Sequence, residues 1–196
     1  MDKGNIICLN GVSSSGKSTL AKSLQENLSE PYYWMSEDTF TFILPDKFNI
    51  FKNDTGENEK IWDQAIINYY HVIKMYSDRG YNVIVDGVLD DEAWVDVFVE
   101  ILHDNPVLFV HVTCPEAELT RRELARGDRE IGLAVEQLDY LCPKEPFYDI
   151  TVDTHVNTAN ECADKIIALL ESPNNFQAFS ALWKQYNADI QKSQIL

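Results

Sequence analysis

The chain has 196 residues, of which 45% are apolar, and a formal net charge of −16 at pH 7. This apolar fraction is sufficient for the core of one ordinary domain and excludes a globally disordered chain. The acidity argues against binding to nucleic acids or to anionic membranes, because such binding needs a basic surface.

Apolar runs alternate with helical patterns along most of the sequence. The runs are apolar throughout, as in Val83-Ile84-Val85, which is typical of strands buried on both faces of a parallel sheet. The expected strands cover residues 5–10, 32–36, 82–86, 107–112 and 148–152, and the expected helices cover residues 18–29, 59–79, 92–103, 116–125, 131–141 and 157–171. Strands that alternate with helices in this way predict an α/β domain over residues 1–172.

Two segments depart from this alternation. Residues 45–59 are polar and are expected to form a loop. After the break at 173–175, apolar side chains recur at helical spacing from Phe176 to Ile190, which predicts an amphipathic helix within residues 173–196. We expect this helix to pack on the same domain in a monomer, and a contact in a homodimer is the alternative.

The strongest motif follows the first apolar run. Residues 11–18 read G-V-S-S-S-G-K-S, a phosphate-binding loop in which the glycines let successive backbone N–H groups point at phosphate oxygens. In this pattern Lys17 reaches the β- and γ-phosphates, and the hydroxyl of Ser18 ligates Mg²⁺. The motif therefore predicts binding of a nucleoside triphosphate at the start of the following helix. The nucleotide-binding residues expected from it are Gly11, Ser13, Ser14, Ser15, Gly16, Lys17, Ser18 and Thr19.

Two aspartates follow expected strands. Asp86 ends V-I-V-D, where an acidic residue can face the Mg²⁺ of a bound nucleotide or can serve only in a strand-end turn. Asp38 can accept a proton from a substrate hydroxyl, or it can cap a short helix, and Glu37 is the neighbouring candidate for the role of base. Since ligands of parallel sheets bind beyond the carboxyl ends of the strands, we expect Lys17, Asp38 and Asp86 in one crevice.

Four of the five arginines fall within nine residues. Arg122, Arg126 and Arg129 are spaced by four and three, so they would share a helical face. An acidic chain that concentrates guanidinium groups in this way is expected to use them on an anion, as a lid that closes over phosphates. In this interpretation Arg126 and Arg129 are catalytic, and Arg122 and Arg126 contact the nucleotide. The alternative is a solvated face paired with Glu123 and two nearby acidic residues.

Aromatic residues are frequent between the second expected strand and the long helix. They could line a pocket for an apolar or aromatic acceptor, and ordinary core packing is the alternative for each of them. These residues are Trp34, Phe40, Phe42, Phe48, Phe51 and Trp62.

The cysteines indicate neither a zinc site nor a disulfide framework, because Cys8, Cys114, Cys142 and Cys162 form no CxxC or Cys/His pattern. Cys8 and Cys114 lie in or beside apolar runs and are expected to be small core residues. The sequence shows no signal segment and no apolar run of the roughly 18 residues that a membrane helix needs. We therefore expect a protein of the reducing cytoplasm.

Taken together, these stretches resemble the chloramphenicol phosphotransferase family, which are small P-loop kinases of the nucleoside-monophosphate-kinase-like type. The resemblance covers roughly residues 5–170. The stretches that carry it read L-N-G-V-S-S-S-G-K-S at 9–18, E-D-T-F at 37–40, V-I-V-D-G at 83–87, A-R-G-D-R-E-I-G-L-A at 125–134 and Y-D-I-T-V-D-T at 148–154. The fourth and fifth are not general features of P-loop proteins and are the more specific part of the match.

The resemblance implies ATP- and Mg²⁺-dependent phosphorylation of a hydroxyl on a small molecule. It also implies a five-stranded parallel sheet in the order 2-3-1-4-5, flanked by helices, with an arginine-bearing lid. Asp38 corresponds to the family's proposed catalytic base, and the loop that contains Thr154 would lie by the adenine.

The acceptor is left open by the sequence. Residues 47–58, which help to form the acceptor pocket in the family, do not align convincingly. Chloramphenicol or a related antibiotic is one candidate, and a sugar acid, a cyclitol or a nucleoside is the alternative. A nucleotide-binding regulator is a further hypothesis, although no N-K-x-D motif for guanine is present. The acidity opposes a polynucleotide acceptor.

Overall fold

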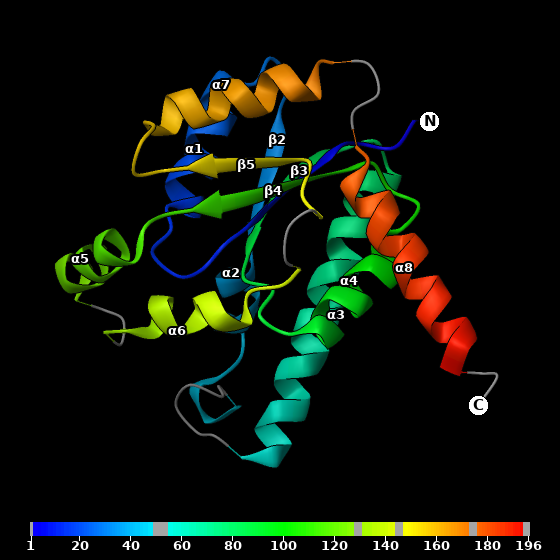
Figure 1. The fold of residues 1–196 in the computed structure, drawn as a ribbon. Coiled ribbons are helices and arrows are strands. Elements are labelled where there is room, and N and C mark those ends of the chain that lie inside the picture. Colours follow the sequence, from blue (N-terminus) through cyan, green and yellow to red (C-terminus); the bar gives the residue numbers. More distant parts are fainter. Residues whose placement is uncertain (1, 49–54, 128–130, 144–146, 173–175, 194–196) are drawn as a thin grey trace.

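The protein is described here by a computed structural model that covers residues 2–48, 55–127, 131–143, 147–172 and 176–193. Strands and helices alternate along the chain (Figure 1). The strands are β1 (Ile6–Asn10), β2 (Tyr32–Ser36), β3 (Asn82–Gly87), β4 (Val107–Thr113) and β5 (Ile150–Asp153). The helices are α1 (Lys17–Asn27), α2 (Glu37–Phe42), α3 (Gly56–Asp78), α4 (Glu92–Leu102), α5 (Glu116–Arg126), α6 (Leu133–Tyr140), α7 (Ala159–Leu170) and α8 (Ala178–Ser193), with a 3₁₀ turn η1 at Asp46–Phe48.

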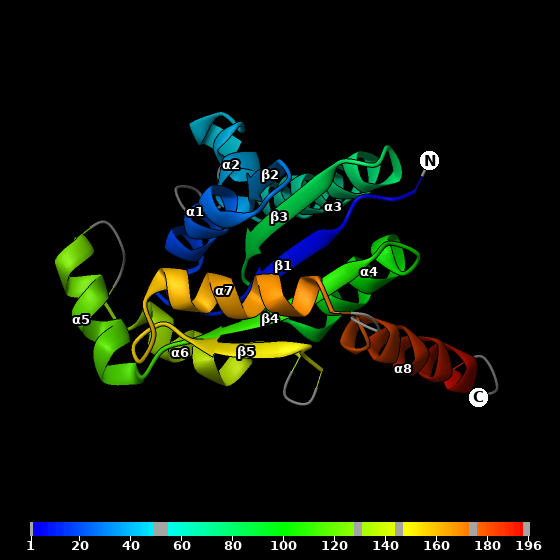
Figure 2. The same cartoon turned by 90° about the horizontal axis from the view of Figure 1, so that it is seen from above.

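The five strands form one parallel sheet in the order β2-β3-β1-β4-β5. Helices α1 and α7 cover one face, and α3, α4 and α8 cover the other (Figures 1 and 2). The predicted α/β fold and its strand order are confirmed. Helices α5 and α6 extend beyond the carboxyl ends of the strands, so this edge of the sheet is flanked by additional chain (Figure 2).

The two-sided burial of the sheet explains why its strands are apolar at every position. Side chains of a strand point alternately to opposite faces. In β1, Ile6 and Cys8 belong to the core under α3 and α4, whereas Ile7 and Leu9 belong to the core under α1 and α7. All four side chains are buried, so the residues on both faces of the strand must be apolar.

Several element boundaries differ from the sequence-based expectation. Helix α3 begins at Gly56 instead of residue 59, because the hydroxyl of Thr55 caps it by accepting a hydrogen bond from the N–H of Asn58 at 3.2 Å. The expected loop at 45–59 also contains η1 in its described part. Strand β5 begins at Ile150 and not at residue 148, because the side chain of Tyr148 packs under β4 and its hydroxyl accepts a hydrogen bond from Nδ2 of Asn10.

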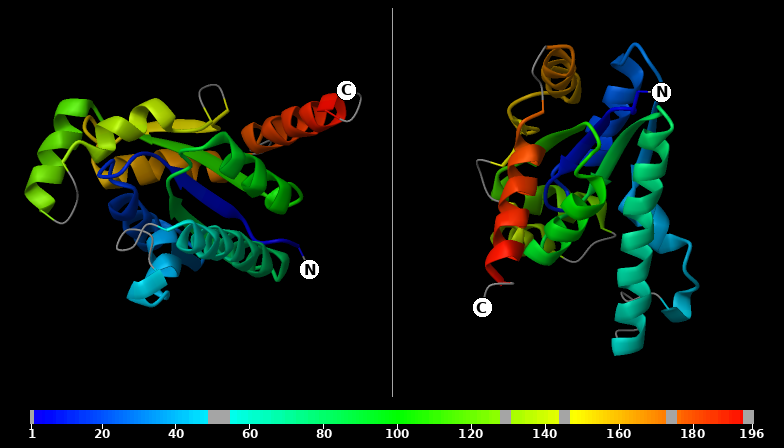
Figure 3. Two further views of the ribbon diagram at one scale, coloured as in Figure 1. Left: turned by 90° about the horizontal axis from the view of Figure 1, so that it is seen from below. Right: turned by 90° about the vertical axis from the view of Figure 1, so that its right-hand side faces the viewer.

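The C-terminal helix α8 packs against α4 and β4. Phe179 is 3% exposed, and its ring meets that of Phe98 edge-on, with a centroid distance of 5.6 Å. Trp183 stacks on His103 at 4.1 Å, and the hydroxyl of Tyr186 donates to Glu100 Oε2 at 2.9 Å. Figure 3 shows α8 leaving the body of the sheet toward its free end.

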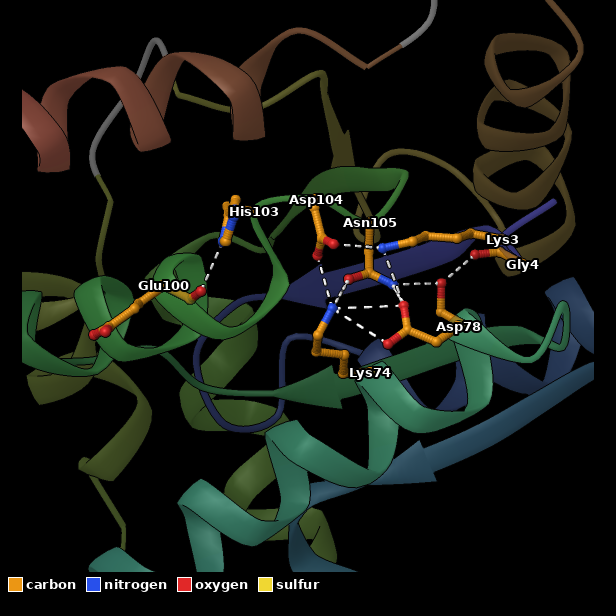
Figure 4. A network of polar contacts seen from close by, with 9 residues as sticks. Lys3, Gly4, Lys74, Asp78, Glu100, His103, Asp104 and Asn105 are labelled. Carbon is orange, nitrogen blue, oxygen red and sulfur yellow. Dashed lines mark hydrogen bonds and ion pairs between the residues drawn. The ribbon is translucent and has the colours of Figure 1, made fainter. Parts of the chain in front are cut away.

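A polar network joins three segments at the amino ends of the strands (Figure 4). Nζ of Lys3 and Nζ of Lys74 each lie 2.7 Å from a carboxylate oxygen of Asp104. Hydrogen bonds from the two lysines hold the pKa of Asp104 below its usual value. Asn105 adds hydrogen bonds to Ser77 and Asp78 at the end of α3. The network fixes the start of the chain to α3 and to the turn before β4, at the opposite end of the sheet from the phosphate loop.

All four cysteines are buried and unpaired with one another, which confirms the expected core roles of Cys8 and Cys114. Among the described residues, no helix is both long and apolar enough to cross a lipid bilayer.

Candidate active site

The loop between β1 and α1 has the tight curl that its sequence predicts. Gly16 has φ of 101° and Ser14 has φ of 59°, so both lie in the left-handed region. Gly11 is required for another reason: a Cβ atom there would lie 2.3 Å from the carbonyl oxygen of Val112. Close approach to β4 and the left-handed turns together give the tight curl from which such loops present backbone N–H groups to an anion.

Lys17 lies within the curl of the loop. Its side chain is almost fully buried, and Nζ donates to the carbonyls of Gly11 at 2.7 Å and Val12 at 2.9 Å. Since the ammonium is anchored to the loop itself, its positive charge is held next to the inward-facing N–H groups. This arrangement is suited to a multiply charged anion.

Ser18 and Asp86 meet across the sheet edge. Oγ of Ser18 donates to Oδ2 of Asp86 at 2.7 Å, and Asp86 is only 4% exposed. Burial raises the pKa of Asp86, and Lys17 and the Ser18 hydroxyl act in the opposite direction. Adjacent hydroxyl and carboxylate oxygens are the donors that Mg²⁺ accepts when phosphates and water complete its ligands, so these residues fit the ion. The described residues contain no cluster of three or more His, Cys, Asp or Glu side chains arranged for a metal.

Glu37 and Asp38 form the first turn of α2, directly beyond β2. Asp38 therefore lies inside a helix, and the interpretation of this residue as its cap is wrong. Oε2 of Glu37 accepts a hydrogen bond from the N–H of Val88 at 3.3 Å. Burial, with the nearby charges of Asp90 and Asp38, raises the pKa of Glu37 to about 7. Asp38 is the more exposed of the two carboxylates.

One cavity of about 820 Å³ connects these groups. It is lined by every predicted site residue that the structure describes except Gly11 and Ser15, which lie beneath the loop surface. The predicted residues in its lining are Ser13, Ser14, Gly16, Lys17, Ser18, Thr19, Asp38, Asp86, Arg122, Arg126 and Thr154. Arg129, predicted to be catalytic, lies outside the described residues.

The cavity lining also contains residues that sequence reasoning missed. Ile66 and Tyr70 come from α3, Trp94 comes from α4, and Asp90 comes from the loop before α4. The rings of Tyr70 and Trp94 lie 6.5 Å apart, edge to face. In the sequence, Ile66 and Tyr70 have only the helical periodicity of an ordinary core face. No local signal separates a core side chain from one at the rim of a cavity.

The predicted aromatic pocket is only partly present among the described residues. Trp62 lines the cavity, but Phe40 packs on Tyr69 with a ring distance of 4.9 Å. Trp34 packs on the core of the opposite face of the sheet, where Nζ of Lys22 lies 5.9 Å from its ring centroid. Phe48 does not line the cavity. Phe51 and the side chain of Phe42 lie outside the described part of the chain.

A further residue found only in the structure is Asn10, which immediately precedes the loop and is 1% exposed. Its Oδ1 accepts from the N–H of Leu89 at 2.9 Å, and its Nδ2 donates to the carbonyl of Cys142 at 2.6 Å. Similarly, Oε1 of Gln137 accepts from the N–H of Ser13 at 2.7 Å. These bonds fix the loops around the cavity relative to β1.

The arginine cluster is arranged differently from the alternative of a solvated face paired with Glu123. Oε1 and Oε2 of buried Glu123 accept hydrogen bonds from the N–H groups of Ala134 and Gly132, so Glu123 caps the start of α6. Glu118 pairs instead with Arg121 and Arg122. Helix α5 ends at Arg126, and Gly127 follows in the left-handed conformation. Arg126 lines the cavity from this last turn.

Comparison with known sequences gives one family over nearly the whole chain. A family model described as chloramphenicol phosphotransferase-like protein matches residues 4–171. A provisionally named O-phosphotransferase of Mycobacterium tuberculosis is 28% identical over 208 residues, covering 95% of this chain and 91% of that protein.

Comparison with solved structures gives kinases of the same fold. The APS kinase CysC of Mycobacterium tuberculosis, in complex with AMPPNP and APS, has a TM-score of 0.66 and 18% identity, covering 88% of this chain and 100% of that chain. A gluconokinase of Sinorhizobium meliloti has a TM-score of 0.61 and 18% identity, with 96% and 97% covered. At this identity the two likenesses show the P-loop kinase fold.

Proposed function

Since the chain belongs to the chloramphenicol phosphotransferase-like family and is a phosphotransferase, we propose that it transfers the γ-phosphoryl group of ATP to a hydroxyl of a small molecule. One observation carries the proposal. The anion-binding loop with Lys17, the Ser18–Asp86 pair and the carboxylate of Asp38 all line one cavity.

The chain's own groups would bind and orient the nucleotide. The loop N–H groups and Lys17 would hold the β- and γ-phosphates. Arg126 would add positive charge from the end of α5, where it can offset charge on the transferring group. Ser18 and Asp86 would hold Mg²⁺, which when bound neutralises charge on the phosphate oxygens.

Asp38 is the residue that we assign as the general base. It would take the proton from the acceptor hydroxyl as the oxygen forms its bond to the γ-phosphorus and the bond from that phosphorus to the β–γ bridging oxygen breaks. ADP then leaves with the electron pair of the broken bond. Glu37 is the alternative base, and Asp38 is preferred because it is the more exposed of these two residues of the cavity lining.

The aromatic part of the cavity lining favours an acceptor with an apolar or ring portion. Trp62, Tyr70 and Trp94 supply aromatic surface there, and Asp90 and Glu37 add carboxylates. Carboxylates repel an anionic acceptor, so a sugar acid and the adenylyl sulfate of the APS kinases fit less well than an uncharged alcohol. Chloramphenicol, related antibiotics, cyclitols and nucleosides are therefore the acceptors to test first.

The test measures acceptor-dependent release of ADP from Mg·ATP over a panel that contains these alcohols and a sugar acid. We expect turnover with an uncharged alcohol and a loss of about 10²- to 10⁴-fold in kcat for Asp38→Asn. ATP affinity, measured by calorimetry, should be unchanged in this variant. Full activity in Asp38→Asn together with loss in Glu37→Gln would transfer the role of base to Glu37. ATP binding without turnover on any acceptor would contradict the proposed phosphotransfer.

A further inference from the structure

One side chain connects helix α5 to the phosphate loop. Nη1 of Arg122 donates to the carbonyl of Ser14 at 3.3 Å and to Oγ1 of Thr154 at 3.0 Å, and Nη2 donates to the carbonyl of Thr154 at 3.0 Å. Nε of Arg122 donates to Oε1 of Glu118 at 2.9 Å, one turn earlier in the same helix. The guanidinium is therefore held by four hydrogen bonds within the protein.

Thr154 completes the connection from the end of β5. Its hydroxyl donates to the carbonyl of Ser15 at 2.6 Å, and its N–H donates to the carbonyl of Thr113 in β4 at 3.1 Å. Two consecutive carbonyls of the phosphate loop, those of Ser14 and Ser15, thus receive donors from outside the loop. A Cβ atom on Gly16 would lie 3.3 Å from Oγ1 of Thr154, so the contact leaves no spare room.

The orientation of these carbonyls matters for anion binding. A peptide unit that turns its carbonyl outward presents an N–H inward, and a run of such units makes a concave anion site. The loop conformation is unfavourable at Ser14, because a residue with a Cβ atom rarely adopts a φ of 59°. Donors that hold the outer carbonyls stabilise this conformation before any ligand arrives.

We propose that Arg122 and Thr154 are positioning residues that hold the phosphate loop in its anion-binding conformation and join it to α5. The inference rests on the proposed function, because it takes nucleotide phosphates as the anion. It gives Arg122 a different role from the nucleotide contact expected from the sequence. Arg122 acts on the phosphates through the backbone of the loop, and Arg126, on the same helix, is left to face the cavity.

Arg121 offers a matched control. Its Nε and Nη2 atoms both donate to Glu118 at 2.7 Å, so it shares the acidic partner of Arg122. Bonds to these two arginines lower the pKa of Glu118 to about 2, which keeps it ionised at neutral pH. The side chain of Arg121 is 68% exposed, compared with 24% for Arg122. Arg121→Ala therefore removes an equal charge from the same helix without removing the contact with the loop.

The experiment measures the affinity of the full chain for two probes by calorimetry. Mg·ATP carries base, sugar and phosphates, whereas Mg-bound inorganic tripolyphosphate carries only phosphates. We expect Arg122→Ala and Thr154→Val each to lower the affinity for both probes by about 5- to 20-fold. Thr154→Ser, which keeps the hydroxyl, should stay within about twofold of the original chain. Arg121→Ala, which removes a charge from the cavity lining but no contact with the loop, should lose less affinity than Arg122→Ala. Because the two residues act as one unit, the double variant should lose less than the product of the single losses.

Three results would overturn the inference while leaving the proposed function intact. A loss confined to Mg·ATP would mean that Arg122 contacts the base or sugar. A loss in Arg122→Ala but not in Thr154→Val would mean that Arg122 binds phosphate directly. Unchanged affinity in both variants would mean that the loop needs no such support.

If the unaltered chain binds neither probe, the proposed function itself fails. Should Arg122→Ala not fold in thermal unfolding, Arg122→Lys and Thr154→Val carry the same comparison.

Discussion

The hydroxyl of Ser18 lies 2.7 Å from the carboxylate of Asp86, although 68 residues separate them in the chain. Ser18 stands at the start of α1 and Asp86 near the end of β3, so the contact joins the phosphate loop to the neighbouring strand. The parallel pairing of β1 with β3 places Leu9 opposite Asp86, which sets the two groups at the same edge of the sheet. This pair is the starting point for the first prediction.

Asp86→Asn should weaken Mg·ATP binding by about 10- to 100-fold, the range typical of groups that support a metal site. Binding of ATP in EDTA should change little, because the loop N–H groups and Lys17 remain. Calorimetry with and without Mg²⁺ checks both statements. Equal losses in the two conditions would show that Asp86 supports the loop and not the ion. Thermal unfolding of the metal-free variant should show no loss of stability, because burial disfavours the charged form of Asp86.

Glu37 should make stability depend on pH. Its pKa is raised from 4.5 to about 7, so the folded protein binds this proton more tightly than the unfolded chain. The resulting stabilisation is fully present below about pH 4.5 and is lost as the pH rises through about 7, with a total of up to about 3 kcal/mol. Urea unfolding of the original chain and of Glu37→Gln at pH 5 and pH 8 measures it.

We expect the difference in unfolding free energy between Glu37→Gln and the original chain to favour the variant more at pH 8 than at pH 5. Glu26→Gln, at an exposed position of α1, serves as the control for the removal of one carboxylate. A difference that does not vary with pH would contradict the raised pKa of Glu37.

Gly11→Ala should abolish nucleotide binding, because the new Cβ would lie 2.3 Å from the carbonyl of Val112 and the loop backbone would have to move away from β4. Gly56→Ala is the matched control. No atom lies within 4 Å of a Cβ built there, and the position begins a helix, so we expect neutral or slightly higher stability. Thermal shift with and without Mg·ATP reads out both effects. A ligand-induced shift that survives in Gly11→Ala would contradict the tight approach.

Phe179→Ala should destabilise the whole protein by about 3–5 kcal/mol, as expected for removal of a buried phenyl ring. The unfolding transition should stay single, because this ring packs on Phe98 and Phe109 of the main core. Ala substitution at exposed Tyr140 serves as the control. Light scattering of both variants tests the alternative role of α8 in a dimer, since loss of a dimer with unchanged stability would contradict the packing interpretation.

Trp62→Ala should raise KM for the acceptor by about 10-fold or more while leaving the Kd for ATP unchanged. Trp62 lines the cavity from α3, a different element from the phosphate loop. Trp183→Ala is the comparison, because Trp183 stacks on His103 and does not line the cavity. Steady-state kinetics at saturating ATP separates the two. Equal effects of both variants on acceptor KM would show that neither tryptophan forms the acceptor site.

The fold was accessible from the sequence because its signals are local. Buried strand residues such as Ile6–Leu9 must be apolar on both faces of the sheet. The helices between the strands each have an apolar face that packs on the sheet. The predictions were wrong at the ends of helices and strands, where a single capping residue or contact determines the first residue of the element. Thr55 caps α3, so this helix begins three residues before the expected start. Tyr148 packs in the core, and β5 begins two residues after its expected start. The hydrophobic periodicity of the sequence shows neither effect.

The amino-acid sequence alone determined the phosphate loop, because the backbone geometry that surrounds an anion requires glycine, lysine and hydroxyl residues at fixed spacing. It also determined the parallel sheet and its strand order, through the burial pattern and the resemblance to a known family. Only the tertiary structure decided which carboxylate accepts which donor. Asp86 accepts from Ser18, Glu123 caps α6, and Arg122 turns toward the loop. Such choices depend on distances between segments remote in the chain, and residue spacing along one segment contains no information about them.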